Sequence, residues 1–417
     1  MKLGKAALAA SLAVGGIASS LLSPVAAQPV QPAAVQSAGR TLNLGRDEHL
    51  ALMALQTAAA GPDRVAQDSA LAAARAAVRS ADGRYGFAYY QLQIGLARQD
   101  VQMQGQAVDM LIESNLVVPA EMLPLLANQA MRAYTANEYQ RADRILGRMV
   151  ELQPNNAVVL ADYAQFKSRI RENPQAIALM QRALAAQEAT GQRAPEGWYR
   201  RALAMGFDSR LAPQTNAFGR ALITAYPTAM NWRDALLSYR ALAQGDPALG
   251  LDVLRLMRVN RALTGERDYL ELVQALTQAE LPGEAKEVLD EGVSRGMLDP
   301  NEPVVRQQLT ALGRRATQAR SGLARSRTQA LAAATGAAAL SAGDAHLGLG
   351  EYGPAIELYQ AALQKGGADA NLVNSRLGMA LALAGRRPEA EAALRAVVGP
   401  RAELAAFWLV WLARPAV

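Results

Sequence analysis

The sequence predicts an all-α fold built from short antiparallel helix pairs. From about Glu48 onward the chain is rich in Ala, Leu, Arg, Gln and Glu, with apolar residues at helical spacing and almost no alternating β-branched runs. Turn signals interrupt this pattern about every 15 to 20 residues. The pairs also recur with a nearly constant period, which distinguishes a repeat array from a single helical bundle.

The turn signals combine Gly, Pro, Asn and Asp, which are the residues that most often form tight turns. They fall at Ala136-Asn137-Glu138, Gln153-Pro154-Asn155, Glu172-Asn173-Pro174, Gly245-Asp246-Pro247, Leu281-Pro282-Gly283 and Gly385-Arg386-Arg387-Pro388. Their spacing leaves room for one short helix between neighbouring signals, so consecutive helices are expected to run antiparallel.

The period is visible in the alanine that opens the second helix of each predicted pair. These alanines are Ala107, Ala142, Ala176, Ala285, Ala355 and Ala390. The first three are spaced by 35 and 34 residues, the last two by 35, and the fourth precedes the fifth by 70. The same distance therefore recurs at both ends of the chain.

A small residue stands twelve positions before most of these alanines. The pairs are Gly95 with Ala107, Ala130 with Ala142, Ala164 with Ala176, Gly343 with Ala355, and Gly378 with Ala390. Helices pack closely where small side chains meet, so the fixed offset predicts one recurring crossing. Four positions after the alanine comes a bulky residue to fill the adjoining groove, namely Leu111, Leu146, Met180, Leu289, Tyr359 or Leu394. We expect Pro119, Pro154 and Pro247 to end second helices.

With these positions the chain resembles the tetratricopeptide repeat family. That family's unit of about 34 residues has small residues at its eighth and twentieth positions, a large one at the twenty-fourth and often proline at the thirty-second. The segment from Leu123 to Pro154 matches well, and residues 157–183 and 336–397 match nearly as well. Leu126 and Leu160 replace the family's usual tryptophan. The resemblance implies a right-handed α-solenoid of helical hairpins.

In this family the first helix of each pair lines a concave groove that binds a peptide. By resemblance, the groove-facing residues here are Tyr89, Met131, Tyr134, Gln165, Arg169, Met379 and Leu383. The family's carboxylate clamp needs lysine and asparagine, and Ala127 and Met131 stand in its first two positions. We therefore expect a peptide held mainly by apolar contacts. The alternative is that several of these side chains pack between neighbouring repeats.

The chain divides into six predicted segments. Lys2 and Lys5, followed by an apolar stretch and Val25-Ala26-Ala27, predict a signal peptide over residues 1–27, with an uncleaved anchor as the alternative. The remaining segments are a flexible leader (28–45), an N-terminal repeat array (46–197), an irregular helical middle (198–302), basic bridging helices (303–343), and a C-terminal repeat pair with a capping helix (344–417).

Composition and charge narrow the classes of function. The chain has no cysteine, which removes disulfides and thiolate metal sites. Its formal charge of +6 falls to +4 without Lys2 and Lys5, a mild excess that favours neither nucleic acid nor a membrane surface. No acidic residue lies between Glu302 and Asp344, whereas Arg306, Arg314, Arg315, Arg320, Arg325 and Arg327 all lie there. These arginines form either a solvated helix face or a dock for an acidic partner or an anionic envelope polymer.

Two patterns look catalytic until they are placed on the predicted fold. Residues Gly292 to Gly296 match G-x-S-x-G, but they end a predicted helix without the strand that a nucleophile elbow requires. Residues Gly348 to Gly353 match G-x-G-x-x-G, but they fall in the turn of a helical hairpin. Each set of glycines is therefore interpreted as a structural turn.

The remaining candidates for chemistry are also weak. Glu113-Ser114 is similar to the glutamate-serine pair of lytic transglycosylases, but it ends a second helix and lacks that family's further motifs. His49 and His346, the two histidines, are nearly three hundred residues apart and offer no zinc arrangement. No enzyme activity, cofactor or metal is therefore expected.

The sequence thus predicts an exported, periplasmic scaffold or adaptor that binds a protein or peptide partner in a cell-envelope assembly. Two alternatives remain. One is a peptidoglycan-acting enzyme that uses a carboxylate such as Glu113. The other is a structural subunit that self-associates through the aromatic C-terminal helix from Glu403 to Leu412.

Overall fold

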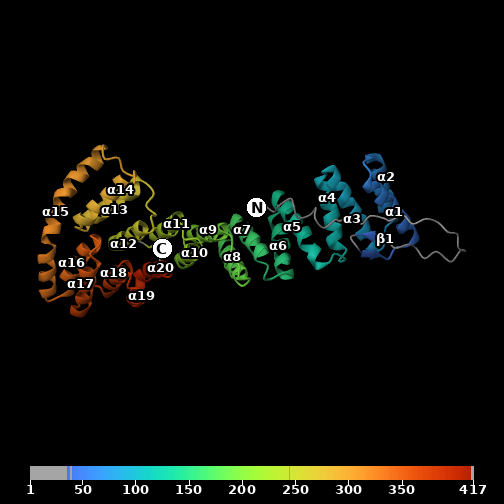
Figure 1. The fold of residues 1–417 in the computed structure, drawn as a ribbon. Helices are drawn as coiled ribbons and strands as arrows, with labels where there is room; N and C mark the ends of the chain where they lie inside the picture. Colours follow the sequence, from blue (N-terminus) through green and yellow to red (C-terminus); the bar gives the residue numbers. More distant parts are fainter. Residues whose placement is uncertain (1–34, 38–39, 244, 415–417) are drawn as a thin grey trace, which may run out of the picture. The chain divides into compact units, whose positions relative to one another are not determined.

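A computed structural model describes residues 35–37, 40–243 and 245–414 of the chain (Figure 1). These residues contain twenty α-helices, one short 3-10 helix and two three-residue strands. The chain divides into two compact units, with the boundary between Thr190 and Gly191. The predicted all-α fold of helical hairpins is confirmed. Among the described residues, no helix combines the length and hydropathy needed to cross a membrane.

Unit 1, which ends at Thr190, contains a small strand pair and eight helices. The elements are β1 (Val35–Ser37), β2 (Arg40–Leu42), α1 (Arg46–Ala60), α2 (Arg64–Ala77), α3 (Ala81–Arg98), α4 (Val101–Glu113), α5 (Pro119–Thr135), α6 (Tyr139–Leu152), α7 (Ala157–Arg169) and α8 (Asn173–Glu188). Consecutive helices pack as hairpins, α1 with α2 through α7 with α8.

Unit 2, which begins at Gly191, contains the other twelve α-helices and the 3-10 helix η1. They are α9 (Glu196–Asp208), α10 (Ala212–Ala225), α11 (Ala229–Leu242), α12 (Pro247–Val259), α13 (Glu266–Gln278), α14 (Pro282–Ser294), α15 (Pro303–Ala332), α16 (Gly336–Gly348), α17 (Tyr352–Lys365), α18 (Ala370–Leu383), α19 (Arg387–Arg395), η1 (Gly399–Arg401) and α20 (Ala402–Leu412).

The segment before α1 differs from the predicted flexible leader. β1 and β2 pair antiparallel, with Val35 opposite Leu42, and the Leu42 side chain is buried in the core beside α3. The described part of residues 28–45 is thus anchored by one leucine that the composition argument overlooked. Residues 28–34 and the predicted signal peptide, residues 1–27, lie outside the described residues.

One kind of turn recurs in the hairpins of both units. In eight hairpins a residue with positive φ lies between the two helices, namely Gln99, Asn137, Arg171, Arg210, Gly245, Glu280, Gly350 or Gly385; the turn between α1 and α2 has none. A left-handed residue at the end of a helix lets the chain reverse within a few residues. From Arg210 onward the spacing is 35 residues, except for a step of 70 from Glu280 to Gly350. The recurrence confirms the period predicted from the sequence.

The predicted close crossing of the two helices is also confirmed. All six repeating alanines have an exposed fraction of 0%. A Cβ atom added to Gly343 would lie 2.7 Å from Cε1 of Tyr359, and one added to Gly378 would lie 2.6 Å from Cγ of Leu394. The small residue of the first helix therefore faces the bulky residue of the second, and it must be small because the two touch.

Two details of the predicted repeat need correction. Gly95 is out of register, because a Cβ added there would lie 3.0 Å from the Gln104 nitrogen, so α3 and α4 cross nearer their turn. Pro119 and Pro247 begin α5 and α12 instead of ending the preceding helix. Proline fits the first turn of a helix because the amide that it lacks has no partner there. Pro154 does lie just after α6.

Helix α15 replaces one complete hairpin. In the 70-residue step from Glu280 to Gly350, its 30 residues lie between α14 and α16, and the turn expected near Arg315 is absent. The positions that hold small residues in regular hairpins are here Gln308 and Arg320, which are too large for a close crossing. The first turns of α8, α10, α14 and α19 contain proline, but residues 317–319 do not. The bridging helices predicted over 303–343 are therefore one long helix followed by the start of α16.

Unit 2 closes on itself through its C-terminal helix. Helix α20 packs on α18 and α19 as predicted for a cap, but it also packs against α10 near the start of the unit. Phe407 and Trp408 are 0% exposed in a core that extends from Ile223 to Leu412. The middle, bridging and C-terminal segments therefore share one core, and these two aromatic side chains are not available for contact with a second copy.

Candidate partner-binding surfaces

The first helices of three hairpins in unit 1, α3, α5 and α7, carry the predicted groove residues Tyr89, Met131, Tyr134, Gln165 and Arg169. We call the surface formed by these five residues the first-helix face. All five side chains are partly or fully exposed to solvent. The face therefore presents aromatic, thioether, amide and guanidinium groups on consecutive repeats.

Tyr134 and Arg169 are the clearest contact on this face. The Arg169 Nη1 donates a hydrogen bond to the Tyr134 hydroxyl at 3.0 Å, and its guanidinium lies 5.7 Å from the centre of the Tyr134 ring. Tyr134 also packs edge-on against Phe166 of the next hairpin, with ring centres 6.2 Å apart. Tyr134 thus packs between two neighbouring repeats. Its side chain is only half-buried, so part of the ring also remains open to solvent.

The other residues of the first-helix face are less closely connected. The Tyr89 ring is edge-on to Tyr90 at 5.4 Å and packs on the core of unit 1. Met131 lines a pocket of about 390 Å³ together with the exposed Val101, the buried Ala133 and the half-buried Arg141. This pocket lies where α4, α5 and the start of α6 meet. It has room for one apolar side chain of a bound segment.

An ion cluster centred on the buried Lys167 supports α7. The Lys167 amine lies 2.6 Å from Asp143 and 2.7 Å from Glu172, and the Tyr163 hydroxyl donates to Asp143 at 2.9 Å. Burial lowers the pKa of Lys167, but its hydrogen bonds to the two carboxylates outweigh burial and raise the pKa overall. Burial, with the hydrogen bond to Asp143, raises the pKa of Tyr163 to about 12. The cluster fixes α7 against α6 and α8.

The predicted groove residues Met379 and Leu383 lie in unit 2, on α18. They line a pocket of about 580 Å³ whose apolar wall includes Leu347 and Leu349. The opposite wall is charged, and there Arg258 Nε lies 2.7 Å from Glu291. Met379 is almost fully buried, so its contribution to a bound segment is limited to the edge of this pocket.

Beside this pocket, unit 2 contains a buried network of six charged side chains. Its members are Asp252, Arg255, Glu284, Asp344, Arg376 and Arg401. Asp252 accepts from Arg255 at 3.1 Å, from Arg376 at 3.3 Å and from Arg401 at 2.8 Å. The three arginines balance the three carboxylates, so the network adds no net charge to the interior.

The two aspartates of the network have pKa values shifted in opposite directions. Burial raises the pKa of Asp252, but the three arginines beside it outweigh burial and lower the pKa overall. Burial raises the pKa of Asp344, and here the attraction of Arg376 and Arg255 is not enough to reverse the shift. Of the two aspartates, Asp252 is therefore the one whose charged form its surroundings favour.

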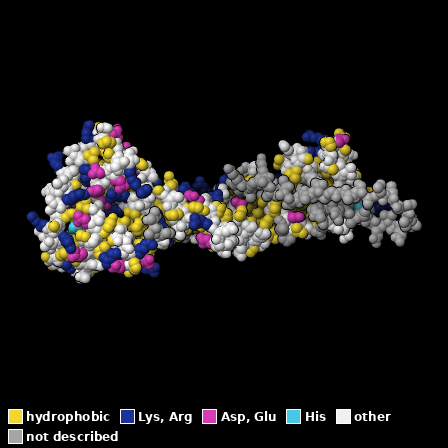
Figure 2. Space-filling model, viewed as in Figure 1, with side chains coloured by type: hydrophobic (Ala, Val, Ile, Leu, Met, Phe, Trp, Pro, Cys, Tyr) yellow, Lys and Arg dark blue, Asp and Glu magenta, His cyan; other side chains and the backbone are white. Residues whose placement is uncertain are grey.

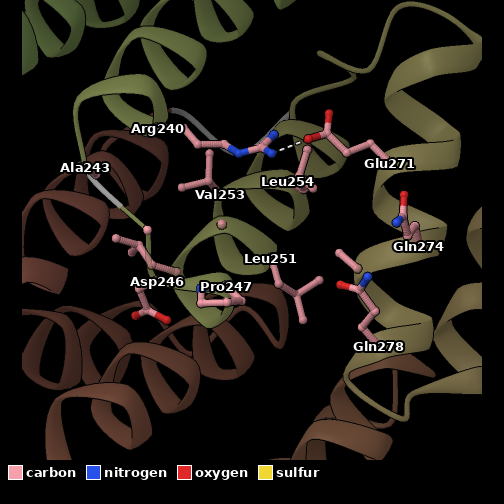
Figure 3. Close-up of a pocket in the computed structure, with 14 residues that line it drawn as sticks. Arg240, Ala243, Asp246, Pro247, Leu251, Val253, Leu254, Glu271, Gln274 and Gln278 are labelled. Carbon is pink, nitrogen blue, oxygen red and sulfur yellow. Dashed lines mark hydrogen bonds and ion pairs between the residues drawn. The ribbon is translucent and has the colours of Figure 1, made fainter.

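A further pocket of about 400 Å³ lies among α11, α12 and α13 (Figure 3). Val253 and Leu254 contribute to its apolar side, and Gln274 and Gln278 point into it from α13. The Arg240 and Glu271 side chains face one another across the pocket and form an ion pair. None of the predicted site residues lies there.

The predicted basic residues all lie on α15, and Figure 2 shows dark-blue side chains along the edge of unit 2 that this helix forms. Arg320 pairs with Glu287 on α14, and Arg327 Nε lies 2.9 Å from Glu357 on α17. The other four, Arg306, Arg314, Arg315 and Arg325, are exposed. None of these four forms an ion pair within the part of the chain that the structure describes.

The patterns that looked catalytic lie at helix ends. Ser294 is the last residue of α14, and its hydroxyl donates to the Glu291 carbonyl. Gly350 has φ of 73° in the turn between α16 and α17. Glu113 ends α4 and is exposed.

Histidine and carboxylate side chains form no metal site in the described residues, where no group of three or more potential ligands occurs. His346 is buried, and its Nδ1 lies 2.6 Å from Glu351 Oε2. His346 is therefore packed in the interior, with Glu351 as its partner.

Sequence comparison gives no match to any family model or to any curated protein. Structure comparison finds a tetratricopeptide repeat protein from Parabacteroides merdae, at 11% identity and a TM-score of 0.32, covering 72% of this chain and 99% of that one. It also finds Naa15/Naa10 bound to HypK-THB (10%, TM-score 0.31, 77% of this chain and 64% of that one) and the TPR2AB domain of yeast Sti1 in a pHSP90 complex (13%, TM-score 0.24, 71% and 95%). The all-α fold of repeated helical hairpins therefore rests on the turns and helix crossings of this chain itself.

Proposed function

We propose that this protein is an exported scaffold or adaptor that binds a segment of a partner protein on the first-helix face of unit 1. The observation that carries the proposal is the contact between Tyr134 and Arg169 beside the pocket lined by Met131. An accessible aromatic ring, a cation and a small apolar pocket on adjacent repeats suit a peptide with an apolar anchor and a neighbouring carboxylate.

The face is suited to binding because it is preorganised. Tyr134 is held by Phe166 and Arg169, and α7 is fixed from behind by the buried Lys167. Side chains that are already ordered lose little entropy when a partner binds. The N-terminal pattern of residues 1–27 supports export, and we place the mature protein in the periplasm as part of a cell-envelope assembly.

Site-specific photocrosslinking in the protein's own cell envelope tests the proposal. A photoreactive benzophenone residue replaces Met131 or Arg169 on the first-helix face, and Arg144 or Arg148 on the exposed surface of α6 in matched controls. We expect a small, reproducible set of envelope proteins to crosslink from the first two positions and not from the controls. The same products from all four positions, or none from Met131 and Arg169, would exclude this face as the binding surface.

A further inference from the structure

Helix α15 leaves a helical surface that no other element covers. In a regular hairpin the second helix packs against the first, but α15 is one continuous helix whose two halves do not fold back on each other. Its first half packs on α14 and its second half on α16 and α17. Between Ala316 and Ala330 no side chain is buried. More than three turns of this helix therefore contact little else in the described chain.

The charge on this surface has a single sign. α15 contains six arginines and no acidic residue, and two of the arginines are used inside the unit by Glu287 and Glu357. At 100° per residue, Arg314 and Arg325 project opposite the buried side chains of Leu312 and Ala316. The two outward arginines are separated by about 16 Å along the helix, calculated from a rise of about 1.5 Å per residue. They face solvent without a counter-ion among the residues that the structure describes.

We propose that the exposed surface of α15 docks an acidic segment of a second protein. The four exposed arginines, Arg306, Arg314, Arg315 and Arg325, spread over about half of the helix circumference. A flat membrane surface can contact only one side of a helix, whereas a flexible acidic chain can reach all four arginines. Guanidinium groups also bind carboxylates in a planar, two-point geometry that a side-chain carboxylate satisfies.

This surface lies in unit 2 and the first-helix face lies in unit 1, so either assignment can fail without the other. The surface would add a salt-sensitive contact to the more apolar one proposed for unit 1. A partner with both an apolar anchor and an acidic stretch would gain affinity by engaging both.

The test measures binding of a fluorescent twelve-residue polyglutamate peptide to the mature chain by anisotropy. The test variant changes the four exposed arginines of α15 to glutamine. The matched control changes Arg64, Arg144, Arg148 and Arg267 to glutamine, which removes the same charge from exposed arginines without ion pairs in the described residues. From the strength of exposed ion pairs we expect about a tenfold or greater loss of affinity in the test variant and less than about threefold in the control. The single variant R325E should weaken binding in the same direction.

Equal losses in the test and control variants would overturn the proposal, because binding would then follow net charge alone. Binding of the wild type to anionic phosphatidylglycerol vesicles through α15, with no binding to polyglutamate, would also overturn it in favour of a membrane surface. Helical content from circular dichroism, compared among all variants, verifies that the substitutions leave the fold intact. Unchanged polyglutamate binding when Met131 is replaced would separate this surface from the first-helix face.

Discussion

Asp252 and Arg376 are 124 residues apart in the sequence, yet they form an ion pair at 3.3 Å in which both side chains are buried. Asp252 lies on α12 and Arg376 on α18, so the pair joins the early and late hairpins of unit 2. Arg401, just before α20, reaches the same carboxylate. The closure of unit 2 therefore depends on charge as well as on apolar packing.

Replacing Asp252 with asparagine should strongly destabilise unit 2. The substitution leaves three buried arginines with two carboxylates, and breaking a buried ion pair from one side typically costs about 3–5 kcal/mol. Urea unfolding followed by tryptophan fluorescence measures the effect on this unit alone, because Trp198, Trp232, Trp408 and Trp411 are the four tryptophans of the chain and all lie in unit 2.

The matched control for this change is Asp290→Asn. Asp290 pairs with Lys286 at the exposed surface of α14, and exposed pairs contribute little to stability. We expect its unfolding midpoint to stay close to that of the wild type. A D252N protein as stable as this control would show that the buried network does not hold unit 2 closed.

Stability should depend on pH through the same carboxylate. The folded pKa of Asp252 lies below its usual 3.8, so the unfolded chain binds more protons in the window between the two values. Stability from Asp252 is therefore fully present above pH 3.8 and is lost as the pH falls through the lower folded pKa. Across this window, the free energy of unfolding should fall more steeply with decreasing pH for the wild type than for D252N. Equal slopes for the two proteins would contradict the prediction.

The close helix crossings predict opposite effects for two glycine-to-alanine changes. In Gly378→Ala the new Cβ would lie 2.6 Å from the Leu394 side chain, so we expect a loss of about 1–3 kcal/mol from overpacking. In Gly353→Ala, within α17, the new Cβ has nothing within 4 Å, and higher helix propensity should stabilise by up to about 1 kcal/mol. Urea unfolding compares the two proteins.

A compensating change distinguishes crowding from other effects of the first substitution. Gly378→Ala combined with Leu394→Ala removes the side chain that the new methyl group meets. The two changes should then be non-additive, with the double variant more stable than the sum of the single losses implies. Strict additivity would indicate that the two residues do not meet at this crossing.

The regular hairpins could be predicted from the sequence because the residues that define each hairpin lie close together along the chain. A small residue, a turn and a bulky residue at fixed offsets identify one crossing within about 16 positions, as for Gly343 and Tyr359. The part of the first-helix face on α5 and α7 could be predicted from the same repeat positions. Gly95 was placed wrongly because the alanine-rich sequence offers small residues at several neighbouring offsets.

The buried network could not be predicted in the same way. Asp252 and Arg255 stand three positions apart on a helix, a spacing that is usual for solvated surface pairs. The other partners of Asp252, namely Arg376 and Arg401, are more than a hundred residues away from it, and nothing in the local pattern indicates them. Only the closure of unit 2 brings these charges together.

The continuity of α15 can be tested directly, because the chain has no cysteine and two can be introduced cleanly for spin labelling. Gln307 and Gln329 are exposed near the two ends of the helix. A continuous helix separates these positions by about 33 Å at about 1.5 Å per residue. Folded back at Arg315, the two halves would pack as neighbours with axes about 8–10 Å apart. Pulsed electron resonance distances near the longer value are expected. A distribution centred near the shorter one would restore the regular hairpin and remove the uncovered surface on which the acidic docking proposal depends.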